Sequence, residues 1–130
     1  MKRPVILIVD DESDIRQTLV NFLNDRFDCV LKEAENGEEA LKFVRENICD
    51  VMILDIKMPK RNGLSVMKEA KKLGRAIDII IISAWESDDV AREALDFGAT
   101  DYVIKPLDLK AVNLKLSNIL EKRNQRISKI

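Results

Sequence analysis

The stretch Val5-Ile-Leu-Ile-Val-Asp-Asp-Glu12 sets five apolar residues directly before three acidic ones. A short run without any charge is typical of a strand that is buried on both faces, as in a parallel sheet. Charged side chains are costly inside a protein, so the acids mark the point where this strand reaches the surface. The stretch therefore predicts a buried parallel strand whose end carries a cluster of carboxylates.

Length and composition indicate a single globular domain. The 130 residues are enough to bury a core without disulfides or metals, and the balance of 46% apolar and 35% charged residues is that of a soluble protein. The formal net charge of −1 gives no electrostatic case for binding nucleic acid or an anionic membrane. No apolar run approaches the ~20 residues of a membrane span or forms the core of a signal peptide. We therefore expect a cytoplasmic protein.

The chain has no histidine and two cysteines, Cys29 and Cys49, which are far apart in the sequence. Without histidine or a Cys-x-x-Cys pair a zinc site is not expected, and we interpret the cysteines as reduced, half-buried thiols. The absence of histidine also excludes serine and cysteine triads, because each needs a histidine base on the same chain.

Apolar runs rich in valine and isoleucine alternate with helical patterns along the chain. Strands are predicted at 5–9, 29–34, 51–54, 79–82 and 102–104. The helices between them are predicted to turn these residues inward: Ile15, Leu19, Phe22 and Leu23; Ala40, Leu41 and Val44; Leu64, Met67 and Ala70; Val90, Ala91, Ala94 and Leu95; Leu109, Val112, Leu116 and Ile119. Right-handed crossovers then give an α/β fold, a doubly wound sheet of five parallel strands, (βα)5.

Local signals indicate where these helices begin and end. Asn36 followed by Glu39 resembles a capping box, which predicts the start of the second helix. Ser87 and Asp108 are predicted to cap the fourth and fifth helices. Gly74 is predicted to end the third helix in the left-handed conformation.

Polar side chains follow four of the predicted strands, and the carboxyl ends of parallel strands meet at one edge of the sheet, where ligands bind. They are Asp10 and Asp11 after the first strand, Asp55 after the third, Ser83 after the fourth and Lys105 after the fifth. Three carboxylates so close would repel one another unless a cation and the lysine neutralised them. Mg²⁺ suits this set, because it prefers carboxylate oxygens and keeps waters that phosphate oxygens can replace. The sequence therefore predicts a magnesium site that can accept a phosphate dianion.

Each of these residues also has an ordinary interpretation when it is taken alone. Acids after a strand often cap the next helix, a serine there is usually a turn residue, and Lys-Pro is usually a loop. Only their joint placement at one edge favours a functional site.

The motifs around these residues resemble the receiver domain of two-component response regulators, the chemotaxis-regulator family. The motifs are Val9-Asp10-Asp11, Leu54-Asp55-Ile56-Lys57-Met58-Pro59 with Gly63, Ile82-Ser83-Ala84, Gly98-Ala99-Thr100-Asp101-Tyr102 and Lys105-Pro106. The resemblance implies the flavodoxin-like strand order 2-1-3-4-5. It covers about residues 4–121, so a receiver domain is predicted at 1–121, with a helix end or the start of a linker at 122–130.

The resemblance implies a phosphorylation-dependent signalling switch rather than an enzyme. Asp55 would accept a phosphoryl group from the phosphohistidine of a sensor histidine kinase, and the domain would catalyse its own phosphorylation and slow dephosphorylation. Asp11, Asp55 and the backbone carbonyl of Lys57 would bind Mg²⁺, with Asp10 contributing through water. Such chemistry needs mainly positioning and charge neutralisation, so the missing histidine is no obstacle.

The resemblance also implies an output. Lys105 would pair with the phosphoryl oxygens, and Ser83 would hydrogen-bond one of them. Ser83 would move on phosphorylation and Tyr102 would turn inward behind it, which changes the face formed by the fourth helix, fifth strand and fifth helix. That face would control an output partner or domain, or a homodimer, without direct binding of nucleic acid by this domain. The Lys105–Pro106 bond is expected to be cis.

The kinase is expected to dock around Asp55, and this geometry is predicted to leave Ile15, Ile56 and Pro106 near the surface. Trp85 is expected either to obstruct the water that hydrolyses the acyl phosphate or to be a surface aromatic. Three other interpretations remain: an aspartate-nucleophile phosphatase, a flavin-binding module of the flavodoxin type, and a degenerate receiver that acts as a scaffold.

Overall fold

The structure is a computed structural model that describes residues 3–58, 62–84 and 88–128. The strands are β1 (Val5–Val9), β2 (Val30–Ala34), β3 (Val51–Asp55), β4 (Asp78–Ala84) and β5 (Asp101–Lys105). The helices are α1 (Ser13–Arg26), α2 (Gly37–Glu46), α3 (Gly63–Lys71), α4 (Asp88–Asp96) and α5 (Leu109–Ser128). The strands form one sheet in the order β2-β1-β3-β4-β5, and all four pairings are parallel. The predicted fold and strand order are therefore confirmed.

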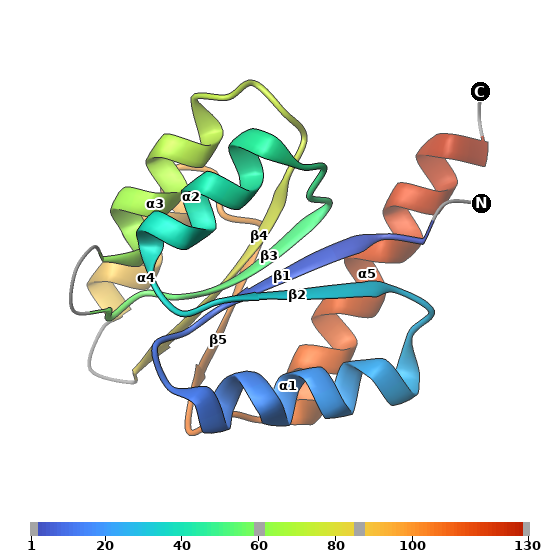
Figure 1. The fold of residues 1–130 in the computed structure, drawn as a ribbon, viewed down its shortest axis with the longest axis horizontal. Coiled ribbons are helices and arrows are strands. Elements are labelled where there is room, and N and C mark those ends of the chain that lie inside the picture. The colour runs from blue at the N-terminus through green and yellow to red at the C-terminus, as the bar shows by residue number, and fades with distance from the viewer. Residues whose placement is uncertain (1–2, 59–61, 85–87, 129–130) are drawn as a thin grey trace.

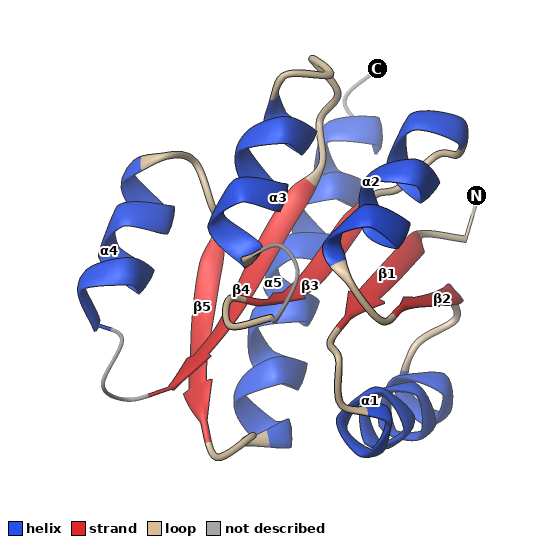
Figure 2. Cartoon of the chain, turned by 60° about the vertical axis from the view of Figure 1, so that its left-hand side comes forward, coloured by secondary structure: helices blue, strands red, loops and turns tan. Residues whose placement is uncertain are grey.

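The sheet separates two apolar cores, with α1 and α5 on one face and α2, α3 and α4 on the other (Figures 1 and 2). Alternate residues of each strand enter opposite cores, because successive side chains of a strand point to opposite faces. On β1, Ile6 and Ile8 pack on the side of α1 and α5, whereas Leu7 and Val9 pack on the side of α2 and α3. This two-sided burial is why the strands are continuous apolar runs.

The helix-capping features predicted at Asn36, Asp108 and Gly74 are present in the structure. The side chain of Asn36 accepts a hydrogen bond from the N–H of Glu39 at 2.9 Å. The carboxylate of Glu39 accepts one from the N–H of Glu35 at 3.1 Å, one residue before the cap. The side chain of Asp108 accepts from N–H groups in the first turn of α5. Gly74 follows α3 with a φ of +70°, as predicted.

The last helix reaches beyond the predicted domain boundary. α5 continues to Ser128, and Arg123 on its last turns donates to Asp78 at 2.7 Å and to Asp50 at 3.3 Å. Asp50 in turn accepts a hydrogen bond from the N–H of Val5 at 2.7 Å. One guanidinium therefore joins α5 to the amino ends of β3 and β4, while the boundary at residue 121 stays a prediction. The predicted cap of α4, Ser87, lies outside the described residues.

Both cysteines are free and more deeply buried than expected, with exposed fractions of 3% for Cys29 and 7% for Cys49. Burial raises the pKa of the Cys49 thiol to about 12. Burial also raises the pKa of the Cys29 thiol, and buried thiols in apolar surroundings are inert, so we assign both a packing role. Within the described ranges, no helix has both the length and the apolar character needed to cross a membrane.

Candidate functional site

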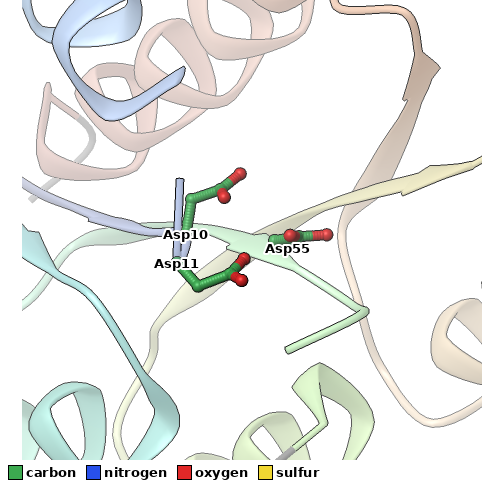
Figure 3. A group of neighbouring side chains, drawn as sticks. All are labelled: Asp10, Asp11 and Asp55. Carbon is green, nitrogen blue, oxygen red and sulfur yellow. The ribbon is translucent and has the colours of Figure 1, made fainter. Parts of the chain in front are cut away.

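Three carboxylates converge at the carboxyl edge of the sheet. β1 and β3 are neighbours, with Val9 paired to Leu54, so the residues after them lie side by side. Figure 3 shows the carboxylates of Asp10, Asp11 and Asp55 directed to the same side of this edge. One oxygen of each lies within 4.8 Å of the others, which is close enough for all three to contact one cation.

Asp10 is the most constrained member of this group. Asp10 is 1% exposed, and its Oδ1 accepts a hydrogen bond from the N–H of Glu12 at 2.9 Å. Oδ2 is buried and has no hydrogen-bond partner among the described residues. Burial, opposed by the hydrogen bond from Glu12 and assisted by the charge of Asp55, raises the pKa of Asp10 to about 6. A buried carboxylate oxygen without a partner is what a bound cation would satisfy.

Asp55 lies at the centre of the site and is 2% exposed. The ammonium of Lys105 lies 3.4 Å from Oδ2, and the backbone N–H of Lys57 donates to Oδ1 at 3.2 Å. Burial raises the pKa of the Asp55 carboxyl, although Lys105 and the hydrogen bond from Lys57 act to lower it. Asp55 is therefore a buried carboxylate held between a cation and a backbone N–H, whereas Asp11 is exposed to solvent.

The first residue of α3, Gly63, packs closely against the backbone of Asp55, and the sequence analysis did not predict this contact. The N–H of Gly63 donates to the carbonyl of Ile56 at 2.7 Å. A Cβ on Gly63 would lie 2.5 Å from the carbonyl oxygen of Asp55, so only glycine fits there. Asn62 caps α3 by accepting a hydrogen bond from the N–H of Ser65 at 2.9 Å. Asparagine directly before the amphipathic stripe was the available signal for this cap.

The remaining predicted site residues lie on β4 and β5. Ser83 is 2% exposed, and its hydroxyl donates to the carbonyl of Ala84 at 3.3 Å. The Lys105–Pro106 peptide bond is cis. Tyr102 is half-buried, and the ammonium of Lys115 lies 5.5 Å from the centroid of its ring. β4 ends at Ala84, two residues beyond the predicted strand end at Ile82, so Ser83 lies within the sheet.

The predicted exposure of Ile56 is wrong. Ile56 is 3% exposed and packs in the core beneath α2 and α3, because its N–H continues the pairing with β4 by donating to Ile82 at 3.0 Å. Ile15 is half-buried against the other core, and Pro106 is exposed. Trp85 lies outside the described residues. Of the expected docking residues in the described ranges, Pro106 alone is largely exposed.

We expect Asp10→Asn to raise the free energy of unfolding by about 2 kcal/mol at pH 7 without divalent cations, because it removes a desolvated charge. The folded state raises the pKa of Asp10 from 3.8 to about 6, so ionisation costs stability as the pH rises through this range. The gain should therefore be full above pH 6 and absent below pH 4. Urea unfolding in EDTA between pH 4 and 8 measures it.

Asp11→Asn is the matched control for this prediction. It removes the same charge from the same cluster, but Asp11 is exposed, so its gain in stability should be smaller. Equal gains for the two variants would show that repulsion among the acids, rather than burial of Asp10, carries the cost.

Comparison with known proteins identifies the family. Residues 6–117 match the family model of the response regulator receiver domain. The chain is 39% identical over 115 residues to the transcriptional regulatory protein ZraR of Klebsiella oxytoca, which covers 88% of the chain and 26% of that protein. It is 31% identical over 126 residues to the probable C4-dicarboxylate response regulator DctR of Bacillus subtilis, with 96% and 54% covered.

The chain thus spans about a quarter of the first relative's length and about half of the second's. Among solved structures, the response regulator receiver domain protein from Clostridium thermocellum superimposes with a TM-score of 0.86 at 30% identity, covering 94% of this chain and 98% of that one. The family model spans all five strands except the first residue of β1, and it includes the carboxyl edge where the acids meet. The chain therefore belongs to the receiver domains of two-component response regulators.

Proposed function

We propose that Asp55 is the phosphoacceptor of this receiver domain and takes its phosphoryl group from the phosphohistidine of a sensor histidine kinase. The observation that carries the proposal is the position of Asp55, whose buried carboxylate lies 3.4 Å from the ammonium of Lys105 and beside two further acids. In the transfer, a carboxylate oxygen of Asp55 forms a bond to phosphorus, and the bond to the donor nitrogen breaks with its electron pair going to that nitrogen.

The residues present fit a bound Mg²⁺ ion. The donor set consists of carboxylate oxygens, which hard divalent cations prefer, and Oδ2 of Asp10 is buried with no hydrogen-bond partner in the described part of the chain. Asp11, Asp55 and the backbone carbonyl of Lys57 would hold the ion, with Asp10 contributing through water. When bound, Mg²⁺ would neutralise the acids and the charge on the phosphoryl oxygens.

The other site residues would position the phosphoryl group and change conformation when it binds. Lys105 would pair with a phosphoryl oxygen, and the Ser83 hydroxyl would turn from the carbonyl of Ala84 toward another. Ser83 pairs with Ile104 in the sheet, two residues after Tyr102, so a shift at Ser83 bears on the strand that carries Tyr102. The face of α4, β5 and α5 would then change its affinity for an output partner or domain, or for a second copy.

The test of this function is phosphorylation of the purified domain by acetyl phosphate. We expect intact-mass spectrometry to show one added phosphoryl group with Mg²⁺ present and none in EDTA, because the acids repel a phosphate dianion that no cation accompanies. BeF₃⁻, a phosphoryl mimic, should bind under the same conditions. A domain that binds Mg²⁺ but gains no phosphoryl group would be a degenerate receiver, and turnover of phosphate monoesters would instead indicate a phosphatase.

We further propose that the kinase approaches over Pro106 and the start of α1, in the cytoplasm. Pro106 is exposed beside Lys105, whereas Ile15 shares its surface with the core under α1. A charge at Ile15 would therefore disturb the fold as well as the docking surface. A substitution at Pro106 is therefore the better test of whether transfer from the kinase can be slowed while labelling by acetyl phosphate is kept.

A further inference from the structure

A groove of about 640 Å³ lies along α3, from Asn62 to Lys72, and against Phe97 at the end of α4. Its lining includes Leu64, Lys68, Glu69, Lys71, Lys72 and Phe97. We call this surface the α3–α4 groove. The phosphorylation chemistry proposed above uses none of these side chains, so the groove needs an explanation of its own.

The apolar part of the groove is an exposed aromatic ring. Phe97 is 51% exposed and is one of three large apolar residues in the described ranges that lie open to solvent, with Ile48 and Leu114. Among these three, Phe97 alone belongs to the groove. The ammonium of Lys68 lies 4.6 Å from the centroid of its ring, so the cation and the ring form one combined surface. Exposed aromatic side chains of this kind are frequent anchors of protein interfaces.

The charged part of the groove is positive, although the chain as a whole has a formal net charge of −1. The lining brings three lysines against the single carboxylate of Glu69. Glu69 is 3.3 Å from Lys72, and Glu93 on α4 approaches Lys68 only to 4.0 Å. These acids leave the groove with an excess of positive charge, which is complementary to an acidic partner.

The lysines also have a structural use that does not account for the whole surface. Cations stabilise the last turn of a helix, and α3 ends at Lys71, whose ammonium donates to the carbonyl of Ile77 at 3.3 Å. That role neither requires Lys72 to be directed into a groove nor explains an exposed aromatic ring beneath Lys68. A ligand with acidic groups around an apolar residue would use all of these features together.

We propose that the α3–α4 groove docks an acidic segment of a partner protein that carries an apolar anchor residue. The anchor packs on the ring of Phe97 and against Leu64, while the flanking carboxylates pair with Lys68 and Lys72. The proposal goes beyond the phosphoacceptor function and does not depend on it, because the groove is present in the unphosphorylated domain. The groove is formed mainly by α3, whereas the face that the family resemblance implies for output is formed by α4, β5 and α5.

The test is an amide NMR titration of the unphosphorylated, ¹⁵N-labelled domain. The probe is a synthetic twelve-residue peptide of aspartate and glutamate with leucine and phenylalanine at its centre. We expect shifts confined to 63–73 and to the residues around Phe97, with binding that weakens as salt is added. A peptide with lysine in place of every acid should leave the spectrum unchanged.

Matched variants separate the groove from general surface effects. Phe97→Ser and the pair Lys68→Glu with Lys72→Glu should each weaken peptide binding by about tenfold. Leu114→Ser removes an apolar side chain on α5 that is more exposed than Phe97, and Lys32→Glu with Lys42→Glu reverses two exposed lysines elsewhere; these controls should not change the affinity. All of these positions are on the surface, and circular dichroism checks that each variant folds.

Four results would overturn the proposal. They are the absence of shifts at millimolar peptide, shifts on another face, equal weakening by the control variants, and equal binding of a single-stranded oligonucleotide, which would indicate a general anion surface. Shifts that depend on domain concentration without peptide would assign the groove to a second copy of the chain. None of these outcomes affects labelling by acetyl phosphate, so the two proposals fail separately.

Discussion

Asp55→Asn is expected to abolish labelling by acetyl phosphate, reducing the rate by about 10³-fold or more, as removal of a nucleophile typically does. An amide has nearly the shape of the carboxylate but does not attack phosphorus. Lys105 and Asp10 would remain in place, so the loss would belong to the nucleophile rather than to the surrounding charge. Intact-mass spectrometry with Mg²⁺ and acetyl phosphate measures the result, and a label that persists would remove Asp55 from this role.

Unfolding does not offer another explanation for that loss. Burial raises the pKa of Asp55, which means that the folded state disfavours its charged form at neutral pH. The asparagine variant should therefore be at least as stable as the parent at pH 7 without metal. Asp11→Asn is the matched control: it removes a charge from the same cluster but keeps the acceptor, so labelling should survive at a higher Mg²⁺ concentration.

The sheet was predictable because a strand that is covered by an apolar core on each face appears in the sequence as a continuous apolar run. Met52 and Leu54 enter one core and Val51 and Ile53 the other, so β3 contains no polar residue before Asp55. The carboxyl edge was predictable for a related reason, since parallel strands deliver whatever follows them to the same place. The order of the strands came from the family resemblance alone.

The burial of individual site residues was harder to predict. Asp10 and Asp11 are adjacent and chemically identical, yet Asp10 is buried and Asp11 is exposed. Adjacent residues leaving a strand point to opposite sides, and composition does not say which side is covered. Ile56 shows the reverse case: it lies two residues after Leu54 and enters the same core, so the alternation of β3 continues past Asp55.

Gly63→Ala is expected to lower the free energy of unfolding by about 3 kcal/mol or more, because the added methyl would overlap backbone atoms that cannot easily move aside. The added methyl would lie 2.5 Å from the carbonyl oxygen of Asp55 and 2.7 Å from Cα of Ile56. Backbone atoms cannot rotate away as a side chain can, so α3 or the end of β3 must shift. Because that shift displaces Asp55, labelling should also slow in the molecules that remain folded.

Gly74→Ala is the control that separates overpacking from the general cost of replacing glycine. Gly74 has a φ of +70° and nothing within 4 Å of the added methyl, so its cost is left-handed strain of about 1 kcal/mol. Labelling should be unchanged in this variant, because Gly74 lies at the far end of α3 from Asp55. Urea unfolding and acetyl phosphate labelling of both variants measure the two effects. Equal losses of stability with normal labelling would show that the start of α3 adapts without moving the acceptor, and that Gly63 does not position Asp55.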